Sequence, residues 1–220
     1  MPWLADAEVG AARGFARALV DARTVGELRR RALQGLAELV PADVLTWDRV
    51  DLATGALRHA ALPSEAEPPG AVEAIVGDAV DRPLLLAHTA GRRPALRLSE
   101  AVEPRRLSHS ELYGDLLHPS GVEYGIAIGV RAGRREVVVA GFGRTEREFS
   151  ERDREVLDLV RPGLEDALRA AAARGRLVRA LAANPPTGTA VVVLDRYGEI
   201  ERSSLDAERW LAEHFGAAEH

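Results

Sequence analysis

The stretch Leu107–Ala172 decides the fold, because it contains five consecutive segments with clear patterns. In chain order these are SHSELYGDLL (108–117), VEYGIAIGV (122–130), RAGR (131–134), REVVVAGFG (135–143) and FSERDREVLDLVRPGLEDALRAA (149–171). The first segment predicts a capped helix, and the second and fourth predict strands joined by a tight turn. The last predicts a long amphipathic helix with its N-cap at Ser150. Antiparallel strands followed by a long helix indicate an α/β (α+β) domain.

The two predicted strands carry apolar side chains on both faces. Alternation along 122–130 places bulky residues on one face (Val122, Tyr124, Ile126, Ile128, Val130) and mostly small ones on the other (Glu123, Gly125, Ala127, Gly129). We expect the bulky face to fill a core or line a cavity, and the small face to let a helix approach closely. A sheet with two apolar faces needs cover on both sides, which predicts helices above and below an antiparallel sheet.

The remaining elements follow from periodicity and from turn residues. Before the central stretch we predict helices at 5–21 and 24–40, strands at 44–50 and 56–62, a loop at 63–70, helices at 71–80 and 84–90, and a short edge strand at 94–99. After it we predict a linker at 184–188, strands at 190–194 and 199–202, and a helix at 204–215.

Two runs within these elements resemble a known family. The run F-S-E-R-D-R-x-V-L-D-L-x-R-P at 149–162 and the hairpin W-D-R-V-D-L-A-T-G-A-L at 47–57 are similar to the GAF-type N-terminal sensor region of LuxR-type regulators from high-GC bacteria, such as actinobacteria. The resemblance implies a GAF-like central antiparallel sheet flanked by helices on both faces. It also implies a non-catalytic, signal-sensing and dimerising region of a cytoplasmic transcriptional regulator. Such a regulator binds DNA through a C-terminal helix-turn-helix, which this sequence does not contain.

The same resemblance suggests how the chain is divided. Residues 1–175 form the predicted GAF-like sensor domain with its N-terminal helices, and 176–188 form the helix end and linker. Residues 189–220 resemble the opening of a PAS domain, with the order strand, Asp-x-x-Gly turn, strand and helix. A whole PAS domain needs roughly a hundred residues. We therefore expect this segment to be truncated.

Composition limits the chemistry. All 29 basic residues of the 220-residue chain are Arg, which is typical of a GC-rich genome, and the net charge of −5 gives no attraction for nucleic-acid phosphates. The absence of Cys excludes disulfides, thiolate metal sites and Cys nucleophiles. No apolar run reaches the ~20 residues of a membrane span. These features predict a cytoplasmic protein without membrane contact.

Candidate ligand-binding residues lie where a GAF pocket would be. They are Trp47, His59, Tyr113, Tyr124, Ile126 and Val139. Aromatic rings with one polar tip suit a small-molecule pocket, although they equally suit a core. Glu111, Asp115 and His118 share a helix face that could bind a metal ion, but a solvated face is the simpler interpretation. We predict no metal, no cofactor and no catalytic residue, with an unknown small molecule as the effector.

The long helix also predicts a partner. Its apolar positions alternate in steps of three and four from Leu157 to Leu181, interrupted by Arg174, as in a coiled-coil seam. We expect a homodimer whose interface includes Leu164, Ala167, Ala171, Val178 and Leu181. Alternatively, the helix packs on its own sheet, or the C-terminal segment folds back on it.

Two functions from different classes follow from these patterns. The first is the non-catalytic sensor, and the alternative is a small-molecule- or cofactor-binding GAF protein with an enzymatic activity. A GAF scaffold that serves only to dimerise is a third possibility. No G-x-S-x-G elbow, H-E-x-x-H helix or N-K-F-D-E signature of cyclic-nucleotide binding is present.

Overall fold

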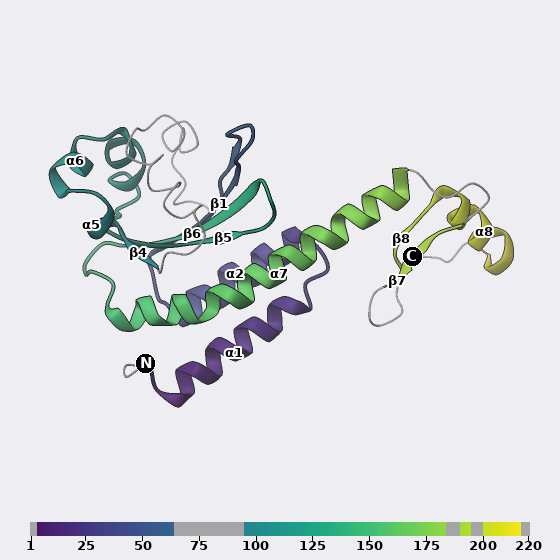
Figure 1. The fold of residues 1–220 in the computed structure, drawn as a ribbon, viewed down its shortest axis with the longest axis horizontal. Helices are drawn as coiled ribbons and strands as arrows, with labels where there is room; N and C mark the ends of the chain where they lie inside the picture. The colour runs from purple at the N-terminus through teal and green to yellow at the C-terminus, as the bar shows by residue number, and fades with distance from the viewer. Residues whose placement is uncertain (1–3, 64–94, 184–189, 195–199, 217–220) are drawn as a thin grey trace.

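The computed structural model describes residues 4–63, 95–183, 190–194 and 200–216 (Figure 1). Within them, six antiparallel strands form the main sheet in the order β2-β1-β6-β5-β4, with β3 also paired to β1. The strands are β1 (Val44–Asp51), β2 (Leu57–Arg58), β3 (Ala61–Leu62), β4 (Leu96–Arg97), β5 (Tyr124–Arg131) and β6 (Glu136–Arg144). The predicted antiparallel sheet is therefore confirmed. The predicted helices at 71–80 and 84–90 lie outside the described residues.

Two strand predictions differ in detail from the structure. The return strand expected over 56–62 is divided into β2 and β3, which are separated by His59 and Ala60. The edge strand expected over 94–99 is reduced to β4, because the chain turns into the helix α5 (Leu98–Ala101) at Leu98. Both changes occur at the border of the cavity described below.

Two helices cover one face of the sheet, and a third packs on their outer side (Figure 1). α2 (Val25–Leu39) and α7 (Glu151–Ala183) contact the strands, and α1 (Asp6–Val20) packs against both helices. Each helix buries one apolar stripe in a common core with the bulky face of the sheet. A Cβ atom added to Gly163 would lie 2.8 Å from the Cβ of Ala16, so α1 and α7 approach closely at this glycine.

A second set of short helices covers the opposite face. It comprises α5, α6 (Pro104–Ser108) and a π-helical turn, η2 (Leu112–Leu117). The single capped helix expected over 108–117 is therefore wrong. Ser108 donates its hydroxyl proton to the carbonyl of Arg105 at the end of α6, whereas Ser110 accepts the backbone N–H of Tyr113 at the start of η2. Helices on both faces confirm the predicted three layers.

A buried ion pair joins the end of β6 to the start of α7. Arg144 Nη1 lies 3.2 Å from Asp153 Oδ2, and Arg144 also donates to the carbonyl of Pro41 through Nε (2.9 Å) and Nη2 (2.6 Å). Its guanidinium lies 4.0 Å from the ring centroid of Phe149. Burial alone would raise the pKa of Asp153, but hydrogen bonds from Ser150 and the Arg144 charge hold that pKa below its ordinary value.

α7 is one continuous helix from Glu151 to Ala183. The predicted boundary between 175 and 176 lies inside this helix. β7 (Val192–Leu194) and β8 (Ile200–Ser203) pair antiparallel and lead into α8 (Leu205–Phe215), in the expected order. Among the helices of the described ranges, none is both long enough and apolar enough to cross a bilayer.

Candidate functional site

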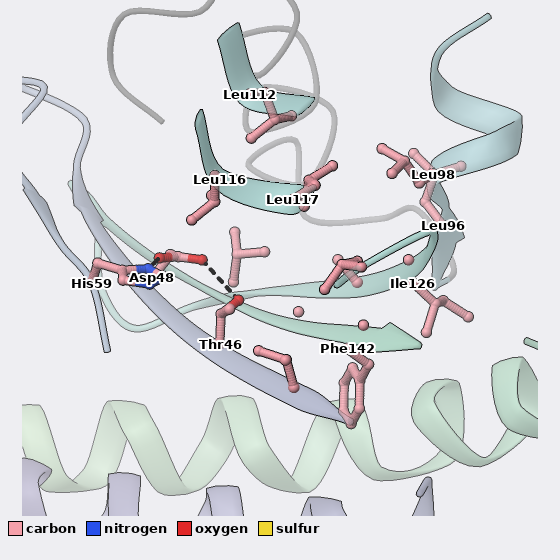
Figure 2. Close-up of a pocket in the computed structure, with 17 residues that line it drawn as sticks. Thr46, Asp48, His59, Leu96, Leu98, Leu112, Leu116, Leu117, Ile126 and Phe142 are labelled. Carbon is pink, nitrogen blue, oxygen red and sulfur yellow. Dashed lines mark hydrogen bonds and ion pairs between the residues drawn. The ribbon is translucent and has the colours of Figure 1, made fainter. Parts of the chain in front are cut away.

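A cavity of about 150 Å³ lies between the sheet and the short helices α5 and η2 (Figure 2). It is on the face of the sheet opposite to α1, α2 and α7. The described residues that line it are Val44, Thr46, Asp48, His59, Leu96, Leu98, Leu112, Leu116, Leu117, Val122, Gly125, Ile126, Ala127, Val139, Gly141, Phe142 and Gly143. Most of this lining is apolar, and the polar side chains are grouped at one end.

The floor of the cavity is formed largely by small residues of β5 and β6. Gly125, Ala127, Gly141 and Gly143 are on the cavity side of the hydrogen-bonded strands. Ile126 and Phe142 border the cavity, but their side chains point to the helices on the other face (Figure 2). The small face, which we expected to admit a helix, admits α5 near Gly125, where an added Cβ would lie 3.3 Å from Leu98 Cβ. Gly125 and Ala127 of this face also line the cavity.

The opposite wall is built by the π-helical turn. His118 donates its backbone N–H to the carbonyl of Tyr113, five residues earlier, at 2.8 Å. This wider turn brings residues four and five positions apart onto one side of the helix. Leu112, Leu116 and Leu117 therefore all face the cavity (Figure 2).

The polar end consists of Thr46, Asp48 and His59. Asp48 Oδ1 lies 2.5 Å from His59 Nδ1, and Thr46 Oγ1 donates to Asp48 Oδ2 at 3.1 Å. The His59 side chain is only 1% exposed. β1 positions the first two residues on alternate sites of one face, and the interruption between β2 and β3 lets His59 approach the carboxylate. An otherwise apolar cavity thus has one hydrogen-bonding end.

The Thr46 hydroxyl donates its proton to the Asp48 carboxylate and not to the His59 imidazole, which contacts the same carboxylate. The described part of the chain also holds no cluster of three or more metal-binding side chains. Glu111, Asp115 and His118, which could have formed one, are exposed.

The structure brings only part of the predicted ligand site together. His59 and Val139 line the cavity with their side chains. Trp47 is buried in the core on the helical side of the sheet, and Tyr124 lies on the same side at the start of β5. Tyr113 donates its hydroxyl proton to Glu123. The ligand-binding roles of these residues remain predictions.

Sequence reasoning missed Thr46 and Asp48. The signal that could have found them is the alternation of β1, which places Val44, Thr46 and Asp48 on one face of a strand whose other face is buried. A carboxylate on a strand next to the sheet centre needs a partner, and His59 was already a candidate.

The wall formed by β4 and α5 is bonded to α7. The backbone N–H of Ala95 donates to Asp158 Oδ1 at 2.8 Å, and Arg97 Nη1 lies 2.9 Å from Glu151 Oε1. Ser99 donates its hydroxyl proton to Glu148 at 2.7 Å, just before α7. The residues between these bonds include Leu96 and Leu98, which line the cavity.

The predicted dimer seam is divided between core and surface. Leu164, Ala167 and Ala171 are buried within the single chain, in the core shared with α1 and the sheet. Arg174 donates to the carbonyl of Ala22 at 2.8 Å. Val178 is half-buried, its neighbour Leu177 is 59% exposed, and the side chain of Leu181 lies outside the described residues. Homodimerisation remains a prediction.

Comparison with known proteins supports the fold. No protein-family model and no curated protein sequence matches the chain. Several solved structures match the chain. The ligand-binding domain of VqsR from Pseudomonas aeruginosa matches with a TM-score of 0.56 and 13% identity, covering 75% of this chain and 96% of that chain. The N-acylhomoserine-lactone-dependent LuxR-family factor CepR2 from Burkholderia cenocepacia matches with a TM-score of 0.54 and 14% identity, covering 78% of this chain and 99% of that chain.

A GAF domain is equally similar. The one from a phosphoenolpyruvate-protein phosphotransferase (ptsP) of Coxiella burnetii matches with a TM-score of 0.53 and 15% identity, covering 77% of this chain and 96% of that chain. The GAF-like fold predicted from the sequence is therefore confirmed. It is a fold that GAF domains share with LuxR-family ligand-binding domains.

Proposed function

We propose that this chain is the non-catalytic sensor region of a transcriptional regulator and that a small molecule binds in the cavity between the sheet and η2. The observation that carries the proposal is the cavity itself, which is apolar and has one polar end. Small-molecule sites are typically concave and mostly apolar, with a few convergent polar groups. The fold is also that of regulator ligand-binding domains.

The volume of the cavity indicates the size of the effector. An apolar cavity of 150 Å³ can hold a molecule such as benzene, and the described residues line a cavity of about that volume. N-acylhomoserine lactones, named for CepR2, are larger than benzene. The lining therefore favours an effector that is mostly apolar with one polar group, and molecules of the size of benzene are suitable probes.

The test combines native mass spectrometry with a filled cavity. Mass spectrometry of the freshly purified chain should detect a bound small molecule. If none is bound, we expect the chain to bind toluene, which serves as a probe. Val139→Phe should abolish toluene binding, because Val139 faces the cavity. The matched control is Val20→Phe, which adds the same bulk at a position that is 69% exposed. Circular dichroism checks that both variants are folded.

Three outcomes decide the matter. Toluene binding by the wild type and by Val20→Phe, with loss in Val139→Phe, supports the proposal. Equal binding by all three proteins would place the ligand elsewhere and overturn it. A wild type that carries no ligand and binds no toluene would also overturn it.

The remaining parts of the proposal concern partners. We infer a homodimer, and contact with DNA only through another domain, because the chain carries a net charge of −5 and therefore has no general attraction to phosphates. A gel-shift assay of the chain alone tests the second point, and a salt-sensitive DNA complex would contradict it. No specific observation among the described residues favours the enzymatic alternative.

A further inference from the structure

The direction of the hydrogen bonds at the polar end of the cavity is determined by chemistry. An ionised carboxylate only accepts hydrogen bonds, so the bond between Thr46 and Asp48 uses the single hydroxyl proton of Thr46. The second carboxylate oxygen accepts from His59 Nδ1. After these bonds, Thr46 Oγ1 and the Asp48 carboxylate offer the cavity lone pairs and no proton.

The lack of a side chain at Gly141 leaves the Thr46 hydroxyl and the Asp48 carboxylate open to the cavity. Thr46 and Gly141 are register partners on β1 and β6, and a Cβ on Gly141 would lie 2.5 Å from Thr46 Oγ1. Any side chain there would displace the hydroxyl or cover it. Figure 2 shows the Thr46 and Asp48 oxygens at the sheet, with the leucines of η2 on the other side of the cavity.

The rest of the described lining offers no competing polar side chain. Apart from Thr46, Asp48 and His59, the residues that border the cavity are aliphatic, glycine or phenylalanine. The backbone of the floor belongs to the paired strands β5 and β6. Among the described lining, polar recognition therefore involves Thr46, Asp48 and His59, and the first two offer oxygen lone pairs.

We infer that the effector carries a hydrogen-bond donor, as in a phenol, an alcohol or an amine, which binds to the Asp48 carboxylate and the Thr46 hydroxyl oxygen. This inference rests on the proposed function and narrows it. A ligand whose only polar atom is a carbonyl or ether oxygen would place its lone pairs against those of Thr46 and Asp48. The cavity thus selects donor-bearing molecules over acceptor-only molecules of the same size.

Three probes of similar shape test the inference in the wild-type chain. They are phenol (a donor), benzaldehyde (an acceptor only) and toluene (neither), with affinities measured by isothermal titration. A hydrogen bond to a charged group corresponds to roughly a tenfold gain or more in affinity. We expect phenol to bind at least about tenfold more tightly than benzaldehyde.

Asp48→Asn provides the second measurement, because it reverses the polarity. The Asn amide nitrogen can donate to Thr46, whose hydroxyl proton is then released toward the cavity. The phenol preference should fall about tenfold or invert, while toluene affinity stays within about threefold. Thr54→Val, in an exposed turn, is the matched control and should change none of the three affinities.

The outcomes separate this inference from the proposed function. Toluene binding without a preference for phenol over benzaldehyde would refute the donor inference alone. An unchanged preference in a folded Asp48→Asn protein would also refute it. If the wild type binds none of the three probes, both the inference and the proposed function are overturned. Should Asp48→Asn fail to fold, the wild-type preference alone decides.

Discussion

Removing Arg144 should destabilise the fold more than removing any exposed arginine. The Arg144 side chain is 9% exposed and its partner Asp153 is 7% exposed. Arg144→Met keeps an unbranched apolar chain but removes the buried one of the two arginines paired with Asp153, so that only the more exposed Arg152 remains, at 3.4 Å. Breaking a buried ion pair costs about 3–5 kcal/mol. The Pro41 carbonyl also loses both of its donors. We therefore expect a loss of about 4 kcal/mol at pH 7.

The loss should depend on pH in a defined direction. The folded-state pKa of Asp153 is held below its ordinary value, so the stability that its ionised form contributes is present above the unfolded pKa of about 3.9 and is lost as pH falls through the folded pKa. Arg144→Met removes one of the causes that lower this pKa. The stability difference between wild type and variant should therefore be full at pH 7 and decrease below about pH 4.

Urea denaturation followed by circular dichroism at both pH values measures the difference. The matched control is Arg169→Met, which breaks an exposed pair with Glu165 on α7 and should cost less than about 1 kcal/mol. A cost for Arg144→Met equal to that of the control, or one that does not change between pH 7 and pH 3.5, would refute this reasoning.

Two further predictions concern the long helix. Gly163→Ala should lower the free energy of unfolding by about 1–3 kcal/mol, because the added Cβ would press on Ala16. Its control, Gly175→Ala, should raise the free energy of unfolding by up to ~1 kcal/mol, because the added Cβ would meet only the end of Arg179. Equal urea midpoints for the two variants would contradict this prediction. Val178→Glu should convert the proposed dimer to a monomer in light scattering, since burying a valine contributes about 1.5–3 kcal/mol. A monomeric wild type at micromolar concentration would argue against the dimer.

Elements with a long, clear period could be predicted from the sequence. β5 and β6 begin and end within about two residues of their predicted limits, and α7 begins directly after its predicted N-cap, because alternation and the Ser150 cap are local signals. The π-helical turn could not be predicted, because SELYGDLL also fits an ordinary helix. Its wider turn accompanies the packing of three leucines around the cavity, which is a tertiary effect.

Periodicity indicated which side of α7 is apolar but not what covers it. The same stripe that suggested a second copy is covered at Leu164 and Ala171 by α1 of the same chain. The site shows the same limit. His59 was found because a histidine is conspicuous, whereas Asp48 seemed to be an ordinary polar residue of a hairpin. The two residues are 11 positions apart on the two arms of the hairpin, and the register of its strands brings their side chains together.

The bonds between the β4–α5 segment and α7 link one wall of the cavity to the long helix. Leu96 and Leu98 line the cavity, and Ala95 on the same short segment is bonded to Asp158. An outward shift of this wall must either break these bonds or tilt the start of α7. From Asp158 to Ala183 the helix rises about 38 Å, at 1.5 Å for each residue. A small tilt at the cavity is therefore a displacement of several times that size at the far end of the helix, near Ala183.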